Sequence, residues 1–173
     1  MKYLKKYKLF ESSEESEDNY YDILDMLKDY SLEFSDDLLD YNIGHSMISG
    51  RGEINGISIK NIQSTRNNMG NYLSKFDFVK YVGTIISICS YMRDMGYESE
   101  IELNQVQFYF DANTNVETGI IRNLGTVNLT QNDLENGIFI SNRRTNGIIF
   151  PAVSRKISNI KGVFQITISF NKI

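Results

Sequence analysis

Apolar residues recur at helical spacing in two segments of the chain. The first segment holds an i, i+3, i+4, i+7 series of apolar side chains: Tyr20, Ile23, Leu24 and Leu27. This spacing places one apolar stripe along a short helix, which we expect to end near Asp29. The acidic stretch before it, ESSEESED, is interpreted as a solvated linker or as the lead-in to this helix, because negative charge stabilises a helix N-terminus.

The second segment gives the clearest helical pattern. Its apolar residues keep helical spacing throughout: Phe78, Val82, Ile85, Ile86, Cys89 and Met92. Ser74 can cap the start of this helix with Asp77 three residues later, and Gly96 supplies its stop. We expect it to be the central core helix, with Val82, Ile86 and Cys89 nearly inaccessible to solvent.

Shorter apolar runs indicate β-structure in the rest of the chain. Before the second helix, Gly50, Gly52 and Gly56 are predicted to be turn residues of a hairpin, next to the alternating Ile57 and Ile59. After Gly96, alternating or apolar runs separated by Asn, Gly and Asp predict strands at 99–103, 105–111, 119–123, 137–141, 147–153 and 162–170.

One helical turn interrupts these strands, where Thr130 can cap TQNDLENG and Gly137 can close it. The pattern as a whole predicts an α+β fold, with two main helices packed on a mainly antiparallel β-sheet and a β-rich C-terminal half. A chain of 173 residues that is 41% hydrophobic can bury one core. We expect residues 1–18, basic and then acidic, to form a flexible segment, and residues 19–173 to form a single α+β domain.

The scarcity of cysteine and histidine limits the kinds of site. With Cys89 as the single cysteine and His45 as the single histidine, neither an intramolecular disulfide nor a four-ligand Cys/His zinc site can form. The opening MKYLKKYKLFE lacks the apolar stretch and cleavage site of a secretory signal. The most apolar stretch, residues 78–92, is too short to cross a hydrocarbon core of about 30 Å. We therefore expect no membrane association.

Two short motifs approach known sites but lack required residues. GHSMI resembles a nucleophile elbow, but Ile48 replaces its closing glycine, and His45 is adjacent to Ser46 and so cannot be a separate general base. DANTNVETG begins like a calcium loop, but Val116 and Arg122 stand where the turn glycine and the bidentate glutamate belong; a hairpin loop explains it better. No phosphate-binding glycine motif occurs. We therefore expect no enzymatic activity, metal or cofactor.

Charge is distributed unevenly along the chain. Residues 1–50 carry 5 basic and 12 acidic residues, whereas residues 118–173 carry 7 basic and 2 acidic residues. This asymmetry can reflect a basic binding face, attraction within one domain, or a head-to-tail contact between copies. The candidate residues for contact with a protein partner or nucleic acid are Arg143, Arg144, Arg155, Lys156 and Lys161.

Nucleic-acid binding is the weaker of these two interpretations. Phe139, Phe150 and Phe164 lie near the basic residues and could stack on bases. They occur, however, in apolar runs that are typical of core packing. A sequence pI of about 5.1 also argues against a dedicated polyanion binder.

The N-terminal region resembles small proteins of tailed bacteriophages. The resemblance rests on the basic-aromatic opening MKYLKKYKLFES followed by the helix YYDILDMLKDY, and covers roughly residues 1–40. Within it, Leu9, Phe10 and Glu11 match the apolar-x-Glu pattern after which phage prohead proteases cut.

This resemblance implies a protein that acts through contacts with other proteins. We expect a minor virion or assembly component that self-associates through an exposed β-edge or apolar patch. The alternatives are a soluble phage protein that binds and modulates a host factor, and a nucleic-acid-binding accessory protein. The expected location is the virion or the cytoplasm of an infected bacterium.

Overall fold

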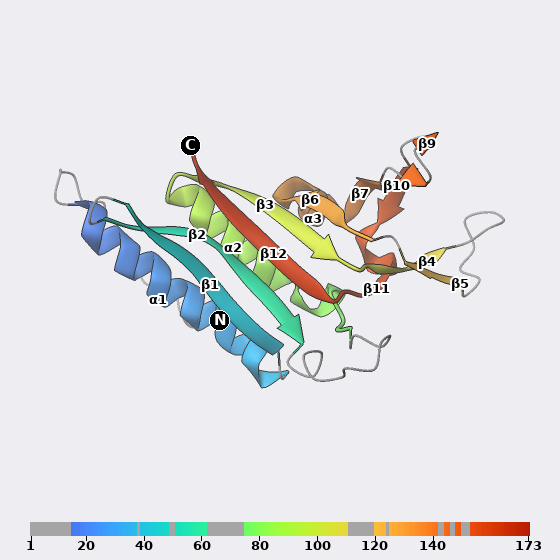
Figure 1. Cartoon of the computed structure of the whole chain (residues 1–173), viewed down its shortest axis with the longest axis horizontal. Helices are drawn as coiled ribbons and strands as arrows, with labels where there is room; N and C mark the ends of the chain where they lie inside the picture. Colours follow the sequence, from blue (N-terminus) through green and yellow to red (C-terminus); the bar gives the residue numbers. More distant parts are fainter. Residues whose placement is uncertain are drawn as a thin grey trace.

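The computed structural model of the chain has two main helices packed on one face of a five-stranded antiparallel sheet (Figure 1). This confirms the predicted α+β class, and strands dominate the C-terminal half. The structure describes residues 15–37, 39–48, 51–61, 75–110, 120–123, 125–141, 144–145, 148–149 and 153–173. Of the predicted flexible segment, residues 15–18 belong to the first helix, and residues 1–14, which include Leu9, Phe10 and Glu11, lie outside the described residues.

The main sheet has the strand order β1-β2-β12-β3-β6, and every neighbouring pair is antiparallel. Its strands are β1 (Leu39–Ile48), β2 (Arg51–Asn61), β12 (Gln165–Lys172), β3 (Tyr97–Asn104) and β6 (Val127–Thr130). The last strand along the chain, β12, therefore lies in the middle of the sheet (Figure 1). β12 alternates between buried and partly exposed residues, as its sequence predicts.

The remaining strands form smaller sheets beside the main one. These strands are β4 (Gln107–Phe110), β5 (Ile120–Asn123), β7 (Ile138–Ser141), β8 (Arg144–Thr145), β9 (Ile148–Ile149), β10 (Val153–Lys156) and β11 (Ile160–Gly162). β11, β4 and β5 form one sheet, β10 pairs with β7, and β8 pairs with β9. Because β4 pairs antiparallel with β5, the predicted hairpin is confirmed, although its DANTNVETG loop lies outside the described residues.

The first helix runs past its predicted end. α1 (Glu15–Asp36) has 22 residues, whereas the apolar spacing placed its end near Asp29. The apolar pattern is interrupted by Ser31, which is buried and donates a hydrogen bond to the Leu27 carbonyl oxygen at 2.6 Å. Phe34, one turn further on, is again fully buried. A satisfied buried hydroxyl therefore extends the core-facing side of this helix.

The second helix starts later than predicted. Its first turn is the 3-10 helix η2 (Val79–Tyr81), which continues into α2 (Val82–Asp94). The Asp77 carboxylate accepts a hydrogen bond from the Val79 N–H at 3.0 Å, and so begins the helix. The proposed cap, Ser74, lies outside the described residues. Gly96 ends this segment with a φ of 84°, as predicted.

The buried side of α2 differs from the expected one. Cys89 is inaccessible as predicted, but Val82 and Ile86 are only partly buried. Ile85, which belongs to the predicted stripe, and Ile88, which does not, are inaccessible instead, and their 3-residue spacing keeps them on one face of the helix. The buried face is therefore rotated relative to a face centred on Val82, Ile86 and Cys89.

The predicted hairpin of β1 and β2 is confirmed, but two of its glycines are strand residues. Gly52 and Gly56 both lie within β2, and the register shift opposite Gly44 leaves Asn55 without a partner. This β-bulge allows Ile54 to face the core although it is out of phase with the other core residues of β2.

The predicted helical turn at TQNDLENG is also confirmed. It forms α3 (Gln131–Asn136), with a capping box between Thr130 and Asp133 and Gly137 in the left-handed conformation. β6, which leads directly into α3, was not predicted from the sequence. A second short 3-10 helix, η3 (Ile157–Asn159), precedes β11.

Ile85 and Ile86 are neighbours in α2 but differ in burial, so their substitutions should differ in their effect on stability. Ile85→Ala is expected to lower the free energy of unfolding by roughly 2 to 5 kcal/mol, because it leaves a cavity at a fully buried position. Ile86→Ala should cost only about 1 kcal/mol. Urea unfolding of both variants measures the difference, and an equal or reversed loss would contradict this assignment.

Gly56 marks a close approach of two strands. A Cβ atom at residue 56 would lie 2.3 Å from the Ile168 carbonyl oxygen, so Gly56→Ala must displace backbone. We expect a loss of roughly 1 to 3 kcal/mol in the free energy of unfolding. Gly83→Ala is the control, because that glycine is in α2 with no atom within 4 Å; stability should be unchanged or raised by up to about 1 kcal/mol. If Gly56→Ala were as stable as the wild type, β2 and β12 would lie further apart at this point than the structure shows.

Candidate protein-interaction surface

Strand β1 is an edge strand of the main sheet among the described residues. It is 10 residues long and pairs with β2 on one side, and no described strand pairs with its other side. Native sheets protect such edges with Pro or Lys residues, with bulges, or with covering segments. β1 contains no Pro, Lys or Arg, and the bulge lies in β2 instead. The backbone groups along this edge therefore have the features of a site for strand addition.

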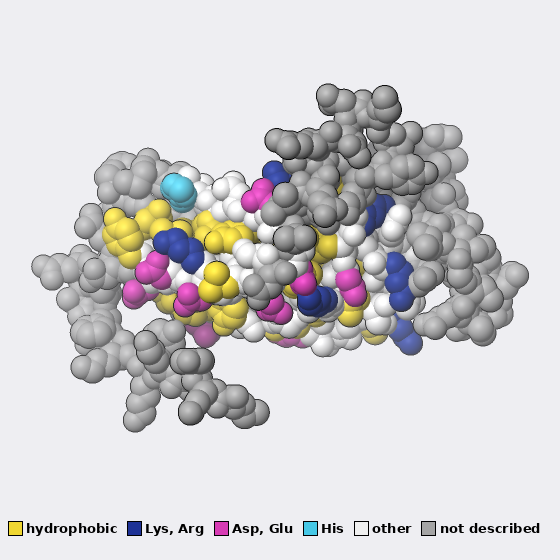
Figure 2. Space-filling model, turned by 90° about the horizontal axis from the view of Figure 1, so that it is seen from below, with side chains coloured by type: hydrophobic (Ala, Val, Ile, Leu, Met, Phe, Trp, Pro, Cys, Tyr) yellow, Lys and Arg dark blue, Asp and Glu magenta, His cyan; other side chains and the backbone are white. Residues whose placement is uncertain are grey.

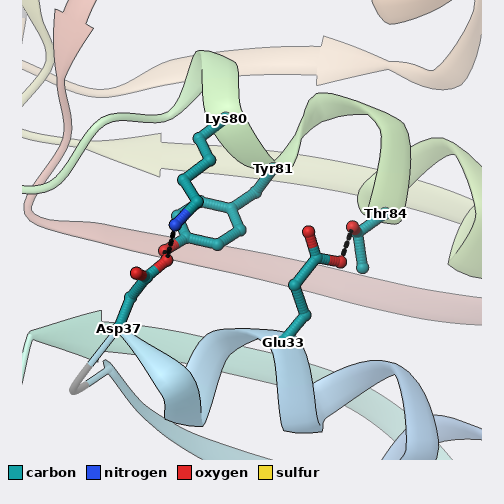
Figure 3. Close-up of polar contacts among 5 residues, drawn as sticks. All are labelled: Glu33, Asp37, Lys80, Tyr81 and Thr84. Atoms are coloured by element: carbon teal, nitrogen blue, oxygen red, sulfur yellow. Dashed lines mark hydrogen bonds and ion pairs between the residues drawn. The ribbon is translucent and has the colours of Figure 1, made fainter.

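The end of α1 is fixed against η2 and α2 by polar contacts. The Asp37 carboxylate, just after α1, accepts hydrogen bonds from the Lys80 ammonium and the Tyr81 hydroxyl (Figure 3). The Thr84 hydroxyl donates to the Glu33 carboxylate. Residues 33 and 37 are one turn apart, so these contacts identify the side of α1 that faces α2.

These contacts shift two pKa values in opposite directions. Hydrogen bonds from Lys80 and then Tyr81 lower the pKa of Asp37 below its ordinary value. Burial, followed by the hydrogen bond to Asp37, raises the pKa of the Tyr81 hydroxyl. The tyrosine therefore stays protonated and the carboxylate stays charged at neutral pH, which maintains the contact between the two helices.

Apolar side chains from α1 and β1 flank the open edge. Tyr20 and Leu24 lie on the side of α1 away from the α2 contacts, and Tyr41 and Ile43 come from β1. All four are partly buried, and we call them the edge seam. Figure 2 shows hydrophobic side chains gathered along this part of the molecule, with acidic side chains beside them. The seam therefore combines an open strand with apolar surface.

The charged residues of α1 mostly avoid the edge seam. Asp22, Asp29 and Glu33 are exposed and follow the flank of the helix that continues into the α2 contacts. On the side facing away from the core, Lys28 pairs with Asp25 at 3.0 Å. The described acidic side chains of α1 therefore lie away from the edge seam.

The structure describes the side chains of three of the five predicted basic residues: Arg155, Lys156 and Lys161. Arg155 and Lys156 are consecutive in β10, so they point to opposite faces of that strand. The Arg155 guanidinium lies 5.1 Å from the centroid of the Phe108 ring, which is a cation–π contact. Lys161 is exposed in β11. Arg143 and the side chain of Arg144 lie outside the described residues.

Lys156 lies at an apolar hollow of about 470 Å³ between α2 and the C-terminal strands. Its lining residues are Val79, Val82, Leu134, Asn136, Gly137, Ile138, Lys156, Ile157 and Ser158. Val79 and Ile138 are exposed to 39% and 46%, so the hollow is a second apolar surface. It lies at the two-stranded sheet of β7 and β10, whereas the edge seam follows β1 of the main sheet.

The aromatic residues proposed as stacking groups take other roles where they are described. Phe139 is buried and packs edge-to-face on Phe108, with ring centroids 6.1 Å apart. Phe164 is partly buried, and Phe150 lies outside the described residues. The core position of Phe139 agrees with the packing interpretation rather than with base stacking.

The residues of the incomplete motifs are also placed by the structure. GHSMI continues β1 as an extended strand, so the strand-to-helix turn of a nucleophile elbow is not formed there.

Cys89 is fully buried, and burial raises the pKa of its thiol to about 11. Among the described residues no group of three His, Cys, Asp or Glu side chains could hold a metal ion. None of the described helices has the length and hydrophobicity needed to cross a membrane.

Comparison with known proteins adds no family assignment. No protein-family model matches the chain. No curated protein and no solved structure matches it significantly either. The surfaces described above are therefore the basis for a proposal about function.

Sequence reasoning did not identify the edge seam. Tyr20 and Leu24 were assigned only to the core stripe of the first helix, and Tyr41 and Ile43 were not singled out. The absence of Pro, Lys and Arg from 39–48 was the available signal. It gains meaning only once β1 is known to be an edge strand, which depends on pairing between distant segments.

The contact between Asp37 and Lys80 predicts a pH dependence of stability. Because the pKa of Asp37 is lowered in the folded state, its stabilising effect is complete above the ordinary value of 3.8 and is lost as the pH falls through the folded-state pKa. Asp37→Asn should therefore be less stable than wild type at neutral pH, and the difference should disappear in strong acid. Urea unfolding across pH measures it, with the exposed Asp22→Asn as control; a pH-independent difference would contradict this role.

Proposed function

We propose that this protein is a non-enzymatic component of a tailed bacteriophage that acts through protein–protein contacts, as a minor virion or assembly component. The observation that carries the proposal is the open edge of β1 with its apolar seam. The resemblance of residues 1–40 to small phage proteins supplies the biological context. The locations that follow from this proposal are the virion and the cytoplasm of an infected bacterium.

The edge strand supports a role in assembly for a physical reason. Its outward N–H and C=O groups can form a new row of main-chain hydrogen bonds with an added strand. Tyr41 and Ile43 lie in the same strand and can pack against side chains of that added strand. A protein that functions only as an isolated monomer is expected to block such an edge, because it promotes association.

Two alternative functions would require a different binding surface or a different location of the protein. A protein that modulates a host factor could use the same edge, but would be found in the infected-cell lysate and not in particles. A nucleic-acid-binding protein needs a basic or aromatic surface. The exposed residues of β3 on the open face of the sheet are instead acidic, namely Glu98, Glu100 and Glu102, and they repel phosphate.

Mass spectrometry of purified phage particles tests the proposal. Peptides of this chain should be present at a constant ratio to the major structural proteins, and this ratio should survive a high-salt wash. A phage enzyme that is abundant in the lysate serves as control for adhering protein and should be removed by the wash. Recovery of this chain only from the lysate would reject the virion role and favour the host-factor alternative.

A further inference from the structure

We propose that β1 pairs with β1 of a second copy, antiparallel about a twofold axis, so that the two five-stranded sheets become one continuous sheet. This inference rests on the proposed function, because it names the partner of the same open edge. The other edge strand, β6, has only 4 residues and runs directly into α3, so it offers far less backbone for pairing. β1 is the edge with enough length for a stable contact.

The side-chain pattern of β1 is compatible with itself. In antiparallel pairing about an axis through Asn42, Tyr41 lies opposite Ile43 of the second copy, on the helix side of the sheet. Asp40 then lies opposite Gly44, on the polar side. Aromatic residues opposite β-branched residues stabilise antiparallel pairs. Self-pairing therefore extends the apolar face of one sheet into the apolar face of the other.

Charge permits the approach of two identical edges. The single acidic residue of β1, Asp40, is paired with Lys60 of β2 at 3.7 Å. The exposed Asp22, Asp29 and Glu33 of α1 lie away from the edge seam, so they do not oppose their own copies across the axis. A protein with net charge −4 would otherwise be expected to repel itself. Among the described side chains, Asp40 is thus the acidic residue at this edge and it is already paired, which favours a second copy over a basic partner.

The helices add apolar surface to the same contact. Tyr20 and Leu24 lie on the β1 side of α1, so pairing of the two β1 strands brings the seam of each copy beside that of the other. Each copy uses the same surface, which makes the interface isologous and closes the assembly at a dimer. A head-to-tail contact between acidic and basic regions would instead build rings or filaments.

Sedimentation velocity on the full chain tests this interface. The wild-type protein is expected to be a dimer, and Asn42→Lys is expected to be a monomer, because the substitution places two lysines near the axis at an exposed position. Asn128→Lys is the matched control: it makes the same change at an exposed residue of the opposite edge strand, β6, and should remain a dimer. Circular dichroism of each variant checks that it is folded.

A charge-pair experiment identifies the twofold arrangement. Asn42→Glu should also be monomeric alone, but an equimolar mixture of Asn42→Lys and Asn42→Glu should form heterodimers, since opposite charges then meet across the axis. The wild-type dimer should persist in about 1 M salt, whereas a contact built on exposed charges should dissociate. Dissociation in salt, or a mixture that stays monomeric, would overturn the β1 interface.

Self-pairing through β1 and the role in the virion can be rejected independently of each other. A wild-type monomer across the micromolar range, or an Asn42→Lys variant that remains dimeric, would reject β1 self-pairing. If that monomeric chain is nevertheless present in washed particles, the virion role stands and the edge binds a different protein there. A dimer that is absent from particles would retain the interface and reject the virion role.

Discussion

Burial of one face of the five-stranded sheet beneath α1 and α2 is the interaction on which the other features depend. Core-facing isoleucines recur in successive strands, as at Ile57 and Ile59 in β2 and Ile166 and Ile168 in β12, and all are fully buried. Burial of apolar area is the main favourable term in folding, and two helices supply the matching apolar stripes. The opposite face remains polar, and there the Gln165 side chain donates a hydrogen bond to the Ser58 hydroxyl at 2.8 Å.

The same arrangement explains why the apolar surface is incomplete at one side. α1 covers β1 and β2, and its end is held toward α2 by the contacts of Asp37 with Lys80 and Tyr81. Tyr41 and Ile43 of the outermost strand are nevertheless only partly buried. The edge seam thus lies where no further described strand continues the sheet beyond β1. An added strand with its own helix would complete the layer.

Local patterns predicted the elements whose formation is local. The Thr130 cap, the Gly96 stop and the β1–β2 hairpin each depend on a few neighbouring residues, and all were found. The predicted end of the first helix near Asp29 was too early, because the burial of Ser31 beyond it is made acceptable by a hydrogen bond that the sequence does not show. The rotated face of α2 and the missed strand β6 have a different cause. They depend on which strands lie beneath or beside them, and that is set by pairing over long sequence separations.

The central position of β12 has a consequence for how the protein is made. A ribosome synthesises β2 and β3 long before residues 165–172, so during translation each of these strands waits with an unpaired edge and an uncovered apolar face. Exposed edges of this kind are where nascent chains associate wrongly or are captured by chaperones. Emergence of β12 from the ribosome is thus the step at which the sheet can close.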